Sequence, residues 1–222
     1  MKKKILVVAA HPDDEVLGCG GTIMKHASRG DEVAVLFMTN GVGARSSDIE
    51  AIKQRKLCAE KVKKILKIKK LIFLNLPDNQ LDTVPLLEII KKIESVIKKF
   101  DPDTIYTHYI NDLNIDHEIT CRAVMTASRP QPKMRLKEIF SYEILSSTEW
   151  QINRDSAFSP NFFNDISKEI NFKIKALKSY SSEMRNCPHT RSIENQISQN
   201  KTRGASVGLK YAEAFSILRI IN

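Results

Sequence analysis

The sequence lacks the features that mark membrane-spanning, repetitive or disordered chains. No apolar run approaches the roughly 20 residues that a membrane span needs, so we expect no membrane span. No internal repeat, low-complexity tract or clear domain boundary interrupts the 222 residues. Apolar residues make up 42% of the chain and charged residues 27%, a balance typical of a folded globular protein. The sequence therefore predicts a single domain covering residues 1–222.

Close cysteine pairs and a secretion signal are also missing. Zinc ribbons and redox motifs need close cysteine pairs, and this chain has none. The basic start leads into only six apolar residues, Ile5–Ala10, whereas a signal peptide needs roughly 7–15. We therefore expect reduced thiols, a buried first strand and a cytoplasmic location. The four cysteines are Cys19, Cys58, Cys121 and Cys187.

An excess of acidic residues is absent too. Lys and Arg number 35 and Asp and Glu 26, which gives a net charge of +9. This balance leaves nucleic acid, an anionic membrane surface or an anionic small substrate as partners. The lysines in 61–70 and 91–99 mostly lie on the outer faces of predicted helices, and aromatic residues that could stack on bases make up only 7%. We therefore expect no nucleic-acid partner.

Predicted strands and helices alternate through the first part of the chain. Such alternation is typical of βαβ units, so the sequence predicts an α/β fold with a parallel sheet. Apolar runs predict strands at Ile5–Ala10, Glu32–Met38, Leu71–Leu76 and Thr104–Thr107. Helical periodicity predicts helices at Glu15–Ser28, Asp48–Leu66, Leu86–Lys99 and Asp116–Ser128.

The last third of the chain is less regular. A strand is predicted at Ile139–Leu145, followed by a polar, irregular segment at Ser147–Asn161. Helices are predicted at Phe162–Tyr180 and Gly208–Leu218. We expect this part of the chain to help shape a substrate pocket.

A first group of polar residues follows the first strand, where α/β sheets bind their ligands. His11 and Asp14 stand three residues apart across a strand-to-helix turn, and imidazole with carboxylate suits zinc or another first-row metal. Asp13 would then be free to act as a general base. An alternative is that one Asp only caps the helix, but capping needs one carboxylate, not a histidine with three consecutive acids.

The glycines after this motif do not predict a nucleotide-binding loop. Gly18, Gly20 and Gly21 lie inside a predicted helix and do not match the G-x-G-x-x-G pattern directly after a strand. We expect them to allow close packing between the helix and the sheet.

A second group follows the fourth strand and would emerge at the same sheet edge. His117 would lie in the first turn of a helix, whose dipole favours the neutral imidazole that a metal ligand requires. Asp116 is either the N-cap of this helix or a contact that holds a metal-bound histidine. His108 is either a buried, hydrogen-bonded histidine or part of the site. Asp112 and Asn114 are expected near the pocket, and either could cap the helix.

Together the two groups resemble the PIG-L/LmbE superfamily of zinc-dependent N-deacetylases. The resemblance rests on Ala10-His11-Pro12-Asp13-Asp14-Glu15 and on Asp116-His117 about a hundred residues later. It extends over most of the chain through Thr39-Asn40-Gly41, Leu76-Pro77-Asp78-Asn79, Pro188-His189-Thr190-Arg191-Ser192 and Tyr211-Ala212-Glu213-Ala214-Phe215.

The resemblance implies a Rossmann-like three-layer sandwich with a mainly parallel sheet. It further implies zinc, with Fe²⁺ an alternative in cells, held by His11, Asp14 and His117, and Asp13 as general base. Many members carry a histidine, thought to stabilise the oxyanion, at the position of Asn114.

This departure leaves the second catalytic group open. The Asn114 amide could donate to an oxyanion, or His108 or His189 could supply a cation near the substrate. Arg55 resembles a family position that contacts the polar end of the substrate; the alternative is a solvated helix face.

The function implied is hydrolysis of the acetamide of an N-acetylglucosamine-type sugar or glycoconjugate to a free amine and acetate. The substrate could be anionic or linked to a carrier, and a homo-oligomer is compatible with the sequence. Two alternatives stay open: a zinc amidase acting on a non-sugar N-acyl substrate, and a non-catalytic Rossmann protein that binds nucleotide or nucleic acid. The chain lacks the phosphate-binding loop that a nucleotide-binding function would need.

Overall fold

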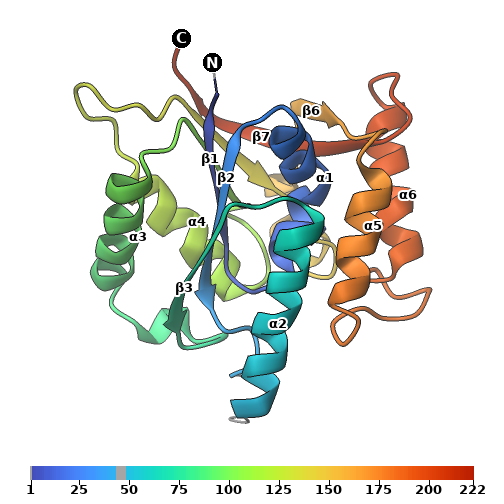
Figure 1. Ribbon diagram of the computed structural model, residues 1–222, viewed down its shortest axis with the longest axis horizontal. Coiled ribbons are helices and arrows are strands. Elements are labelled where there is room, and N and C mark those ends of the chain that lie inside the picture. The colour runs from blue at the N-terminus through green and yellow to red at the C-terminus, as the bar shows by residue number, and fades with distance from the viewer. Residues whose placement is uncertain (1, 44–48) are drawn as a thin grey trace.

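The computed structural model describes residues 2–43 and 49–222, and among these seven strands form one sheet with helices on both faces (Figure 1). The strand order is β3-β2-β1-β4-β5-β7-β6. The strands are β1 (Lys4–Ala9), β2 (Glu32–Thr39), β3 (Lys70–Leu76), β4 (Thr104–His108), β5 (Glu138–Tyr142), β6 (Phe162–Asp165) and β7 (Ala212–Ile220). The helices are α1 (Asp14–Ser28), α2 (Ile49–Ile65), α3 (Leu86–Phe100), α4 (Ile115–Ala127), α5 (Ile170–Ser179) and α6 (Ile193–Ala205). Short 3₁₀ turns lie at η1 (Leu81–Thr83), η2 (Thr148–Trp150) and η3 (Arg154–Ser156).

The first five strands of the chain run parallel to one another, and only β7 breaks the pattern. It lies between β5 and β6 and is antiparallel to both. Helices α3 and α4 cover one face, and α1, α2 and α5 cover the other (Figure 1). The predicted α/β class, a three-layer sandwich with a mainly parallel sheet, is confirmed. The predicted start of the second helix at Asp48 lies outside the described residues.

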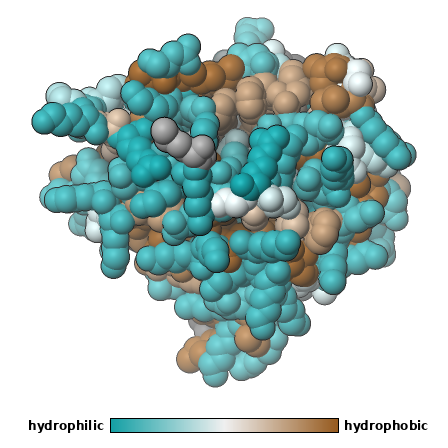
Figure 2. Space-filling view, turned by 45° about the horizontal axis from the view of Figure 1, so that its top comes forward, coloured by the Kyte–Doolittle hydropathy of each residue, from teal (hydrophilic) through white to brown (hydrophobic). Residues whose placement is uncertain are grey.

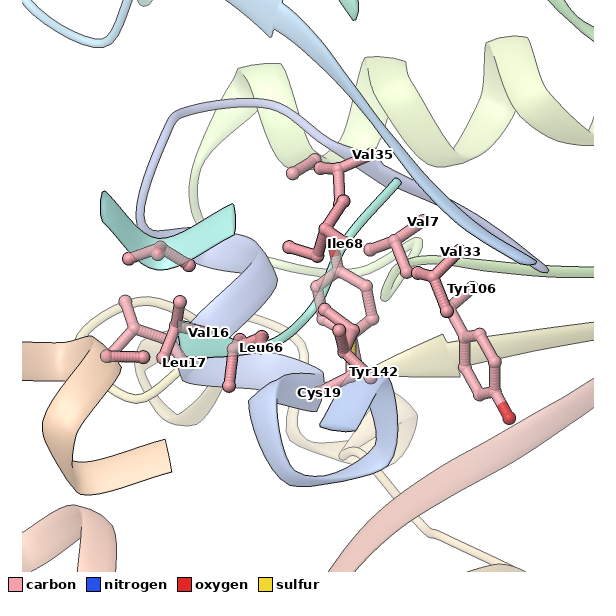
Figure 3. Close-up of a cluster of buried hydrophobic side chains, with 14 of the residues drawn as sticks. Val7, Val16, Leu17, Cys19, Val33, Val35, Leu66, Ile68, Tyr106 and Tyr142 are labelled. Atoms are coloured by element: carbon pink, nitrogen blue, oxygen red, sulfur yellow. The ribbon is translucent and has the colours of Figure 1, made fainter. Parts of the chain in front are cut away.

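Two hydrophobic clusters, one on each face of the sheet, explain the continuous apolar run at β1. Because side chains alternate along a strand, Ile5 and Val7 pack toward α1 and α2, while Leu6 and Val8 pack toward α3 and α4. Figure 3 shows the first cluster, in which β1 and β2 valines gather with Leu17 of α1. A strand covered on both faces has no polar side, so the absence of alternation was informative.

The glycines of α1 serve close packing, as the sequence predicted. A Cβ atom at Gly18 would lie only 2.3 Å from Cδ2 of Tyr142 on β5, and one at Gly21 would lie 2.8 Å from Ile166. Helix α1 therefore approaches the sheet more closely than any larger residue at these positions would allow.

Gly18→Ala should lower the free energy of unfolding by roughly 1–3 kcal/mol, the usual cost of overpacking a core. The Tyr142 ring cannot easily move aside, because its hydroxyl donates to the Val8 carbonyl at 2.9 Å. Gly20→Ala is the matched control, since its new Cβ would meet the Val16 side chain at a milder 3.1 Å. Urea unfolding of both variants checks this, and equal losses at Gly18 and Gly20 would contradict it.

The predictions for the last third were partly wrong. Residues 162–180, expected to be one helix, form β6 followed by α5. Residues 208–218, expected to be helical, contribute most of β7. Pairing decides both cases: β7 inserts between two strands, and Phe162 of β6 lies opposite Phe215.

The sequence did not predict α6. Its buried side is formed by polar and small residues such as Gln196, Asn200 and Gly204, so it has no apolar stripe. Its one local signal is the N-cap, where the Ser192 hydroxyl accepts the Asn195 N–H.

The surface agrees with the expected solvation of the charged residues. Hydrophilic side chains cover most of the face shown in Figure 2, and Lys91, Lys92 and Lys98 on α3 are exposed. None of the described helices combines the length and apolar character that crossing a membrane requires. The four cysteines are free, as expected; Cys19 and Cys121 are buried, whereas Cys187 is exposed.

Candidate active site

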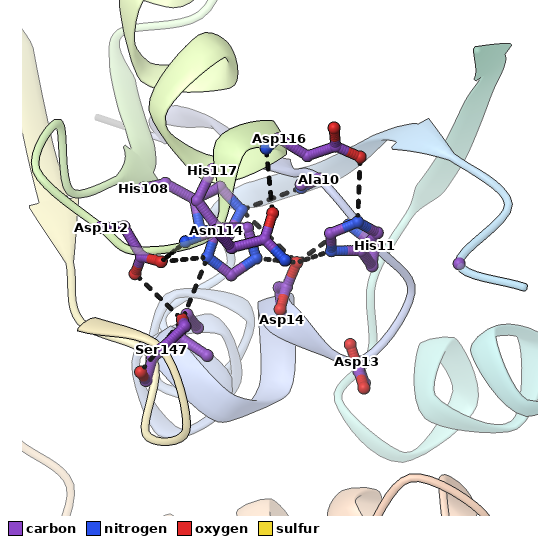
Figure 4. Close-up of polar contacts among 12 residues, drawn as sticks. Ala10, His11, Asp13, Asp14, His108, Asp112, Asn114, Asp116, His117 and Ser147 are labelled. Atoms are coloured by element: carbon purple, nitrogen blue, oxygen red, sulfur yellow. Dashed lines mark hydrogen bonds and ion pairs between the residues drawn. The ribbon is translucent and has the colours of Figure 1, made fainter. Parts of the chain in front are cut away.

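The two polar groups meet at the point where the strand order reverses. β1 lies between β2 and β4, and all three strands are parallel. The loops at the carboxyl ends of β1 and β4 therefore open side by side, which is where open α/β sheets bind ligands. The first loop carries His11 and Asp13 and leads into Asp14 at the start of α1, and the second carries Asp112 and Asn114 before helix α4. Figure 4 shows these side chains converging from both loops.

His11, Asp14 and His117 form a candidate metal-binding set. Asp14 Oδ2 lies 3.1 Å from His11 Nδ1 and 3.3 Å from His117 Nε2. One ligand atom from each of the three residues lies within 4.8 Å of the others. The three ligands predicted from the sequence are thus brought together, in a set that leaves further coordination positions open.

Unsatisfied polarity at Asp14 shows that this set suits a cation. Asp14 is 1% exposed, and its Oδ1 has no hydrogen-bond partner among the described residues. Such an orphaned buried oxygen is costly unless a ligand or ion contacts it.

A second geometric group, His11 with Asp78 and Asp116, suits a cation less well. The Asp116 oxygens already accept the N–H groups of Asn79 and Leu81, at 2.7 and 3.0 Å, and Asp78 accepts the Thr39 hydroxyl at 2.8 Å. Its carboxylates are therefore better placed to orient His11 than to bind an ion.

In each candidate histidine ligand, the ring nitrogen that does not face Asp14 contacts another carboxylate. Asp116 Oδ2 lies 3.1 Å from His11 Nε2, and Asp112 Oδ1 lies 3.1 Å from His117 Nδ1 (Figure 4). The Ser147 hydroxyl lies 3.3 Å from the same His117 nitrogen. These contacts leave His11 Nδ1 and His117 Nε2 facing Asp14. In metal sites, a supporting carboxylate such as Asp116 or Asp112 fixes the tautomer and orientation of a metal-binding histidine.

The electrostatics of the site favour a positive charge. Burial by itself would lower the pKa of His11, but hydrogen bonds to Asp116 and Asp14 raise it to about 10. Burial likewise opposes protonation of His117, but Asp14 and Asp112 raise its pKa to about 9. Protons held this way must leave when a metal binds, so metal affinity will depend on pH.

Asp13 is held in an unusual backbone conformation. Its φ angle is +144°, which non-glycine residues rarely adopt. The Glu15 carboxylate accepts the Asp13 N–H at 2.9 Å and the Tyr180 hydroxyl at 2.8 Å, and both Glu15 and Tyr180 are buried. Asp13 itself is 2% exposed and lines the pocket. Burial raises its pKa to about 6, an effect that Arg191 partly opposes.

Two arginines surround Asp13. Arg55 is 6% exposed, donates to the Pro12 carbonyl at 2.8 Å and forms an ion pair with Glu183. The alternative of a solvated helix face for Arg55 is therefore wrong. Arg191 Nη1 lies 3.3 Å from Asp13 Oδ2. Both arginines and Glu183 line the same pocket as His11 and His117.

Asn114, not Asp116, caps helix α4. The Asn114 side-chain oxygen accepts the Asp116 N–H at 2.9 Å, and its amide nitrogen donates to Asn79 Oδ1 at 3.1 Å. The N-cap alternative for Asp116 is thus wrong, and its contact with His11 is the one found. Asn114 still lines the pocket.

The structure places two candidate substrate-contacting residues, His108 and His189, outside the residues that line the pocket. His108 is fully buried, and its Nε2 accepts the Ala10 N–H at 2.9 Å while its ring stacks on His117 at 3.9 Å between centroids. Through these contacts His108 packs against His117 and the end of β1, and it does not line the pocket. His189 is exposed, packs edge-on against Trp150 and accepts the Arg191 N–H. It too lies outside the residues that line the pocket.

Sequence reasoning gave no role to several residues that complete the site. Asp78 and Arg191 lie in segments that resemble the family, but the resemblance alone did not show which residue of each segment faces the site. Asp112 was placed only near the pocket, because nothing in its spacing points to His117. Glu183 and Ser147 carried no sequence signal, since only the tertiary fold brings them to the carboxyl ends of β1 and β4.

A doubly wound α/β sheet with two histidines and one carboxylate at its switch point is the kind of arrangement that metal-dependent hydrolases use. The family model for PIG-L, described as GlcNAc-PI de-N-acetylase, matches residues 6–128. The chain belongs to this family, and the resemblance inferred from its motifs is confirmed.

Relatives that cover most of the chain carry deacetylase names. An uncharacterized deacetylase, YaiS, of Escherichia coli strain K12 is 31% identical over 187 residues, covering 82% of this chain and 92% of the relative. A probable N-acetyl-alpha-D-glucosaminyl L-malate deacetylase 2 of Bacillus cereus is 29% identical over 191 residues, covering 82% and 84%.

A solved structure with a similar fold is the N,N'-diacetylchitobiose deacetylase of Pyrococcus horikoshii in complex with its inhibitor MPG. Its TM-score is 0.79 at 23% identity, with 98% of this chain and 84% of that chain covered. At this identity the likeness shows the fold alone.

Proposed function

We propose that this chain is a metal-dependent N-deacetylase that hydrolyses the acetamide of an N-acetylglucosamine-type sugar or glycoconjugate. The observation that carries the proposal is the juxtaposition of the His11, Asp14 and His117 set with the Asp13 carboxylate in one pocket. The deacetylase family and the substrate named for the Bacillus cereus relative support the sugar class.

The metal is proposed to be zinc, with iron(II) the alternative, because two imidazoles and one carboxylate suit both ions. His11, Asp14 and His117 would hold it, and Asp116 and Asp112 would keep the two imidazoles in position. A divalent ion at this position polarises a carbonyl and makes water easier to deprotonate.

Asp13 is proposed as the group that moves the proton. Its carboxylate takes a proton from water as the water oxygen bonds to the acetyl carbon. The C–N bond then breaks, its electron pair stays on the nitrogen, and Asp13 returns the proton there. The products are acetate and a free amine. Arg55 is proposed to contact the polar part of the sugar, since it lines the pocket beside Asp13.

Removing the metal should abolish acetate release, and restoring it should recover the activity. The purified protein is dialysed against a chelator, its metal content is measured, and zinc or iron(II) is added back. Acetate release is followed with N-acetylglucosamine, diacetylchitobiose and N-acetylglucosaminyl malate. Full activity in the metal-free protein would contradict the proposal.

The same assay separates the two rival functions. An N-acetylated amino acid as substrate tests a zinc amidase with a non-sugar substrate, and release from it alone would favour that function. A nucleotide-binding protein without metal chemistry would purify without stoichiometric metal and release no acetate. The cytoplasmic location, the homo-oligomer and the absence of a nucleic-acid partner stay predictions.

A further inference from the structure

Hydrolysis of an amide places negative charge on the carbonyl oxygen, and preorganised donors that meet this charge contribute strongly to catalysis. If the proposed function holds, one donor besides the candidate metal should face the pocket. The residues at hand are His108, His189, Asn114, Arg55 and Arg191.

Three of these residues are poorly placed for the role. His108 lies beneath the site, and His189 lies outside the pocket lining. Asn114 is neutral, and its amide oxygen and nitrogen are both engaged, with Asp116 and Asn79. It can offer at most one further N–H.

The two arginines differ in how far they are already committed. The Arg55 guanidinium is almost fully buried, donates to a main-chain carbonyl and pairs with Glu183. The Arg191 side chain is 20% exposed and therefore reaches the open part of the pocket. Its hydrogen bonds use Nε, which donates to Ser146 Oγ at 2.8 Å, and Nη1, which faces Asp13. Since a guanidinium has five N–H donors, some remain for a substrate oxygen.

Arg191 is also held firmly by its own backbone. Its N–H donates to His189 Nδ1 at 3.0 Å, and its carbonyl accepts the Arg185 N–H at 3.3 Å. The next residue, Ser192, caps helix α6. With its backbone held in this way and its Nε bonded to Ser146, the Arg191 side chain loses little conformational freedom when it meets a substrate.

We propose that Arg191 is a catalytic residue whose guanidinium donates to the scissile acetyl oxygen as negative charge develops there. It lies beside Asp13, so the proton acceptor and this donor face the same acetamide from one side of the pocket. Arginine keeps its charge throughout the reaction and transfers no proton. This role goes beyond the family match, which ends at residue 128.

The test compares Arg191→Gln, Arg191→Lys and Arg191→Ala with the wild type in acetate release from N-acetylglucosamine. Losing one such donor typically lowers kcat about 10²–10³-fold, and we expect that loss in the Gln and Ala variants. KM should change far less, because the donor acts mainly in the transition state. Arg191→Lys should lie between them and the wild type, and millimolar guanidinium chloride should raise the kcat of Arg191→Ala.

The matched control is Arg185→Gln. Arg185 is an exposed arginine of the same segment, and its guanidinium donates to the Ser182 and Met184 carbonyls outside the pocket. Its variant should keep a kcat close to the wild type and show no response to guanidinium. Thermal unfolding and metal content, measured for every variant, separate loss of catalysis from loss of structure.

Each outcome decides the proposal. A kcat for Arg191→Gln within threefold of the wild type, or a higher KM with unchanged kcat, overturns it. If Arg191→Gln does not fold, the Lys variant decides: a folded Arg191→Lys with wild-type kcat overturns the role. If the wild type itself releases no acetate from any acetylated sugar, the proposed function fails and this role fails with it.

Discussion

Replacing Asp13 with Asn should lower kcat for acetate release by roughly 10²–10⁴-fold while the protein keeps its metal. The amide has nearly the same shape as the carboxylate but cannot take a proton from water. Asn is a better choice than Ala here, because it keeps the size and shape of the Asp side chain at a position whose backbone φ of +144° is unusual. The measurement pairs steady-state kinetics with metal analysis of the same sample.

A change at Asp112 provides the contrast. Asp112 lies against His117 Nδ1 and does not line the pocket. Asp112→Asn should weaken metal binding by about 10–100-fold, because the histidine loses the carboxylate that orients it. Saturating metal should restore much of its activity, whereas no amount of metal should restore Asp13→Asn. If metal rescues Asp13→Asn, Asp13 acts as a ligand and its role as general base is wrong.

The sequence was sufficient to predict the first half of the fold because that half obeys local rules. Ile5–Ala10 is apolar at every position, and such a short run is typical of a strand covered on both faces. Beyond residue 160 the local signals compete with tertiary pairing. The segment Ala212–Ile220 has mixed apolar character, and it becomes a strand because β5 and β6 each offer it a free edge. Helix α6 escaped notice because its buried face is polar.

The candidate site likewise contains residues that the sequence could predict and residues that only the tertiary structure reveals. His11, Asp14 and His117 could be chosen from the sequence because few other chemistries need two imidazoles and a carboxylate at the ends of neighbouring strands. The residues that surround Asp13 could not. Tyr180 and Arg191 approach from a segment about 170 residues later in the chain, and only the packing of α5 against α1 brings them there. The pocket is thus completed by the part of the chain that the sequence predicted least well.

Helix α1 is supported by a buried ion pair between Lys173 of α5 and Glu213 of β7. The helix is interrupted at Cys19, whose φ of −146° and ψ of 27° are not helical. An interruption of this kind leaves carbonyl and N–H groups without partners inside the helix. The buried Glu213 carboxylate accepts the N–H groups of Gly21 and Thr22, at 2.9 and 2.7 Å. Lys173 donates to the Leu17 carbonyl at 2.9 Å and to Glu213 at 2.7 Å.

Glu213→Ala should therefore be among the most destabilising single changes in this protein. Both side chains of the pair are only 1% exposed, so the variant leaves the Lys173 ammonium buried without a counter-charge. Breaking a buried pair in this way costs roughly 3–5 kcal/mol. Two N–H groups at the interruption also lose their acceptor, which adds to the loss. Since small domains are stable by only about 5–15 kcal/mol, part of the population should unfold.

Urea unfolding of the variant against a surface control measures this effect. Glu60→Ala removes an exposed partner of Lys63, at 3.7 Å, and pairs of that kind contribute about 0–1 kcal/mol. Lys173→Met should destabilise less than Glu213→Ala, because the remaining carboxylate still accepts the two N–H groups. If Glu213→Ala unfolds at the same urea concentration as Glu60→Ala, the ion pair does not hold the interruption. In that case the first turn of α1, which carries Asp14, is positioned by other contacts, such as the one between Glu15 and Tyr180.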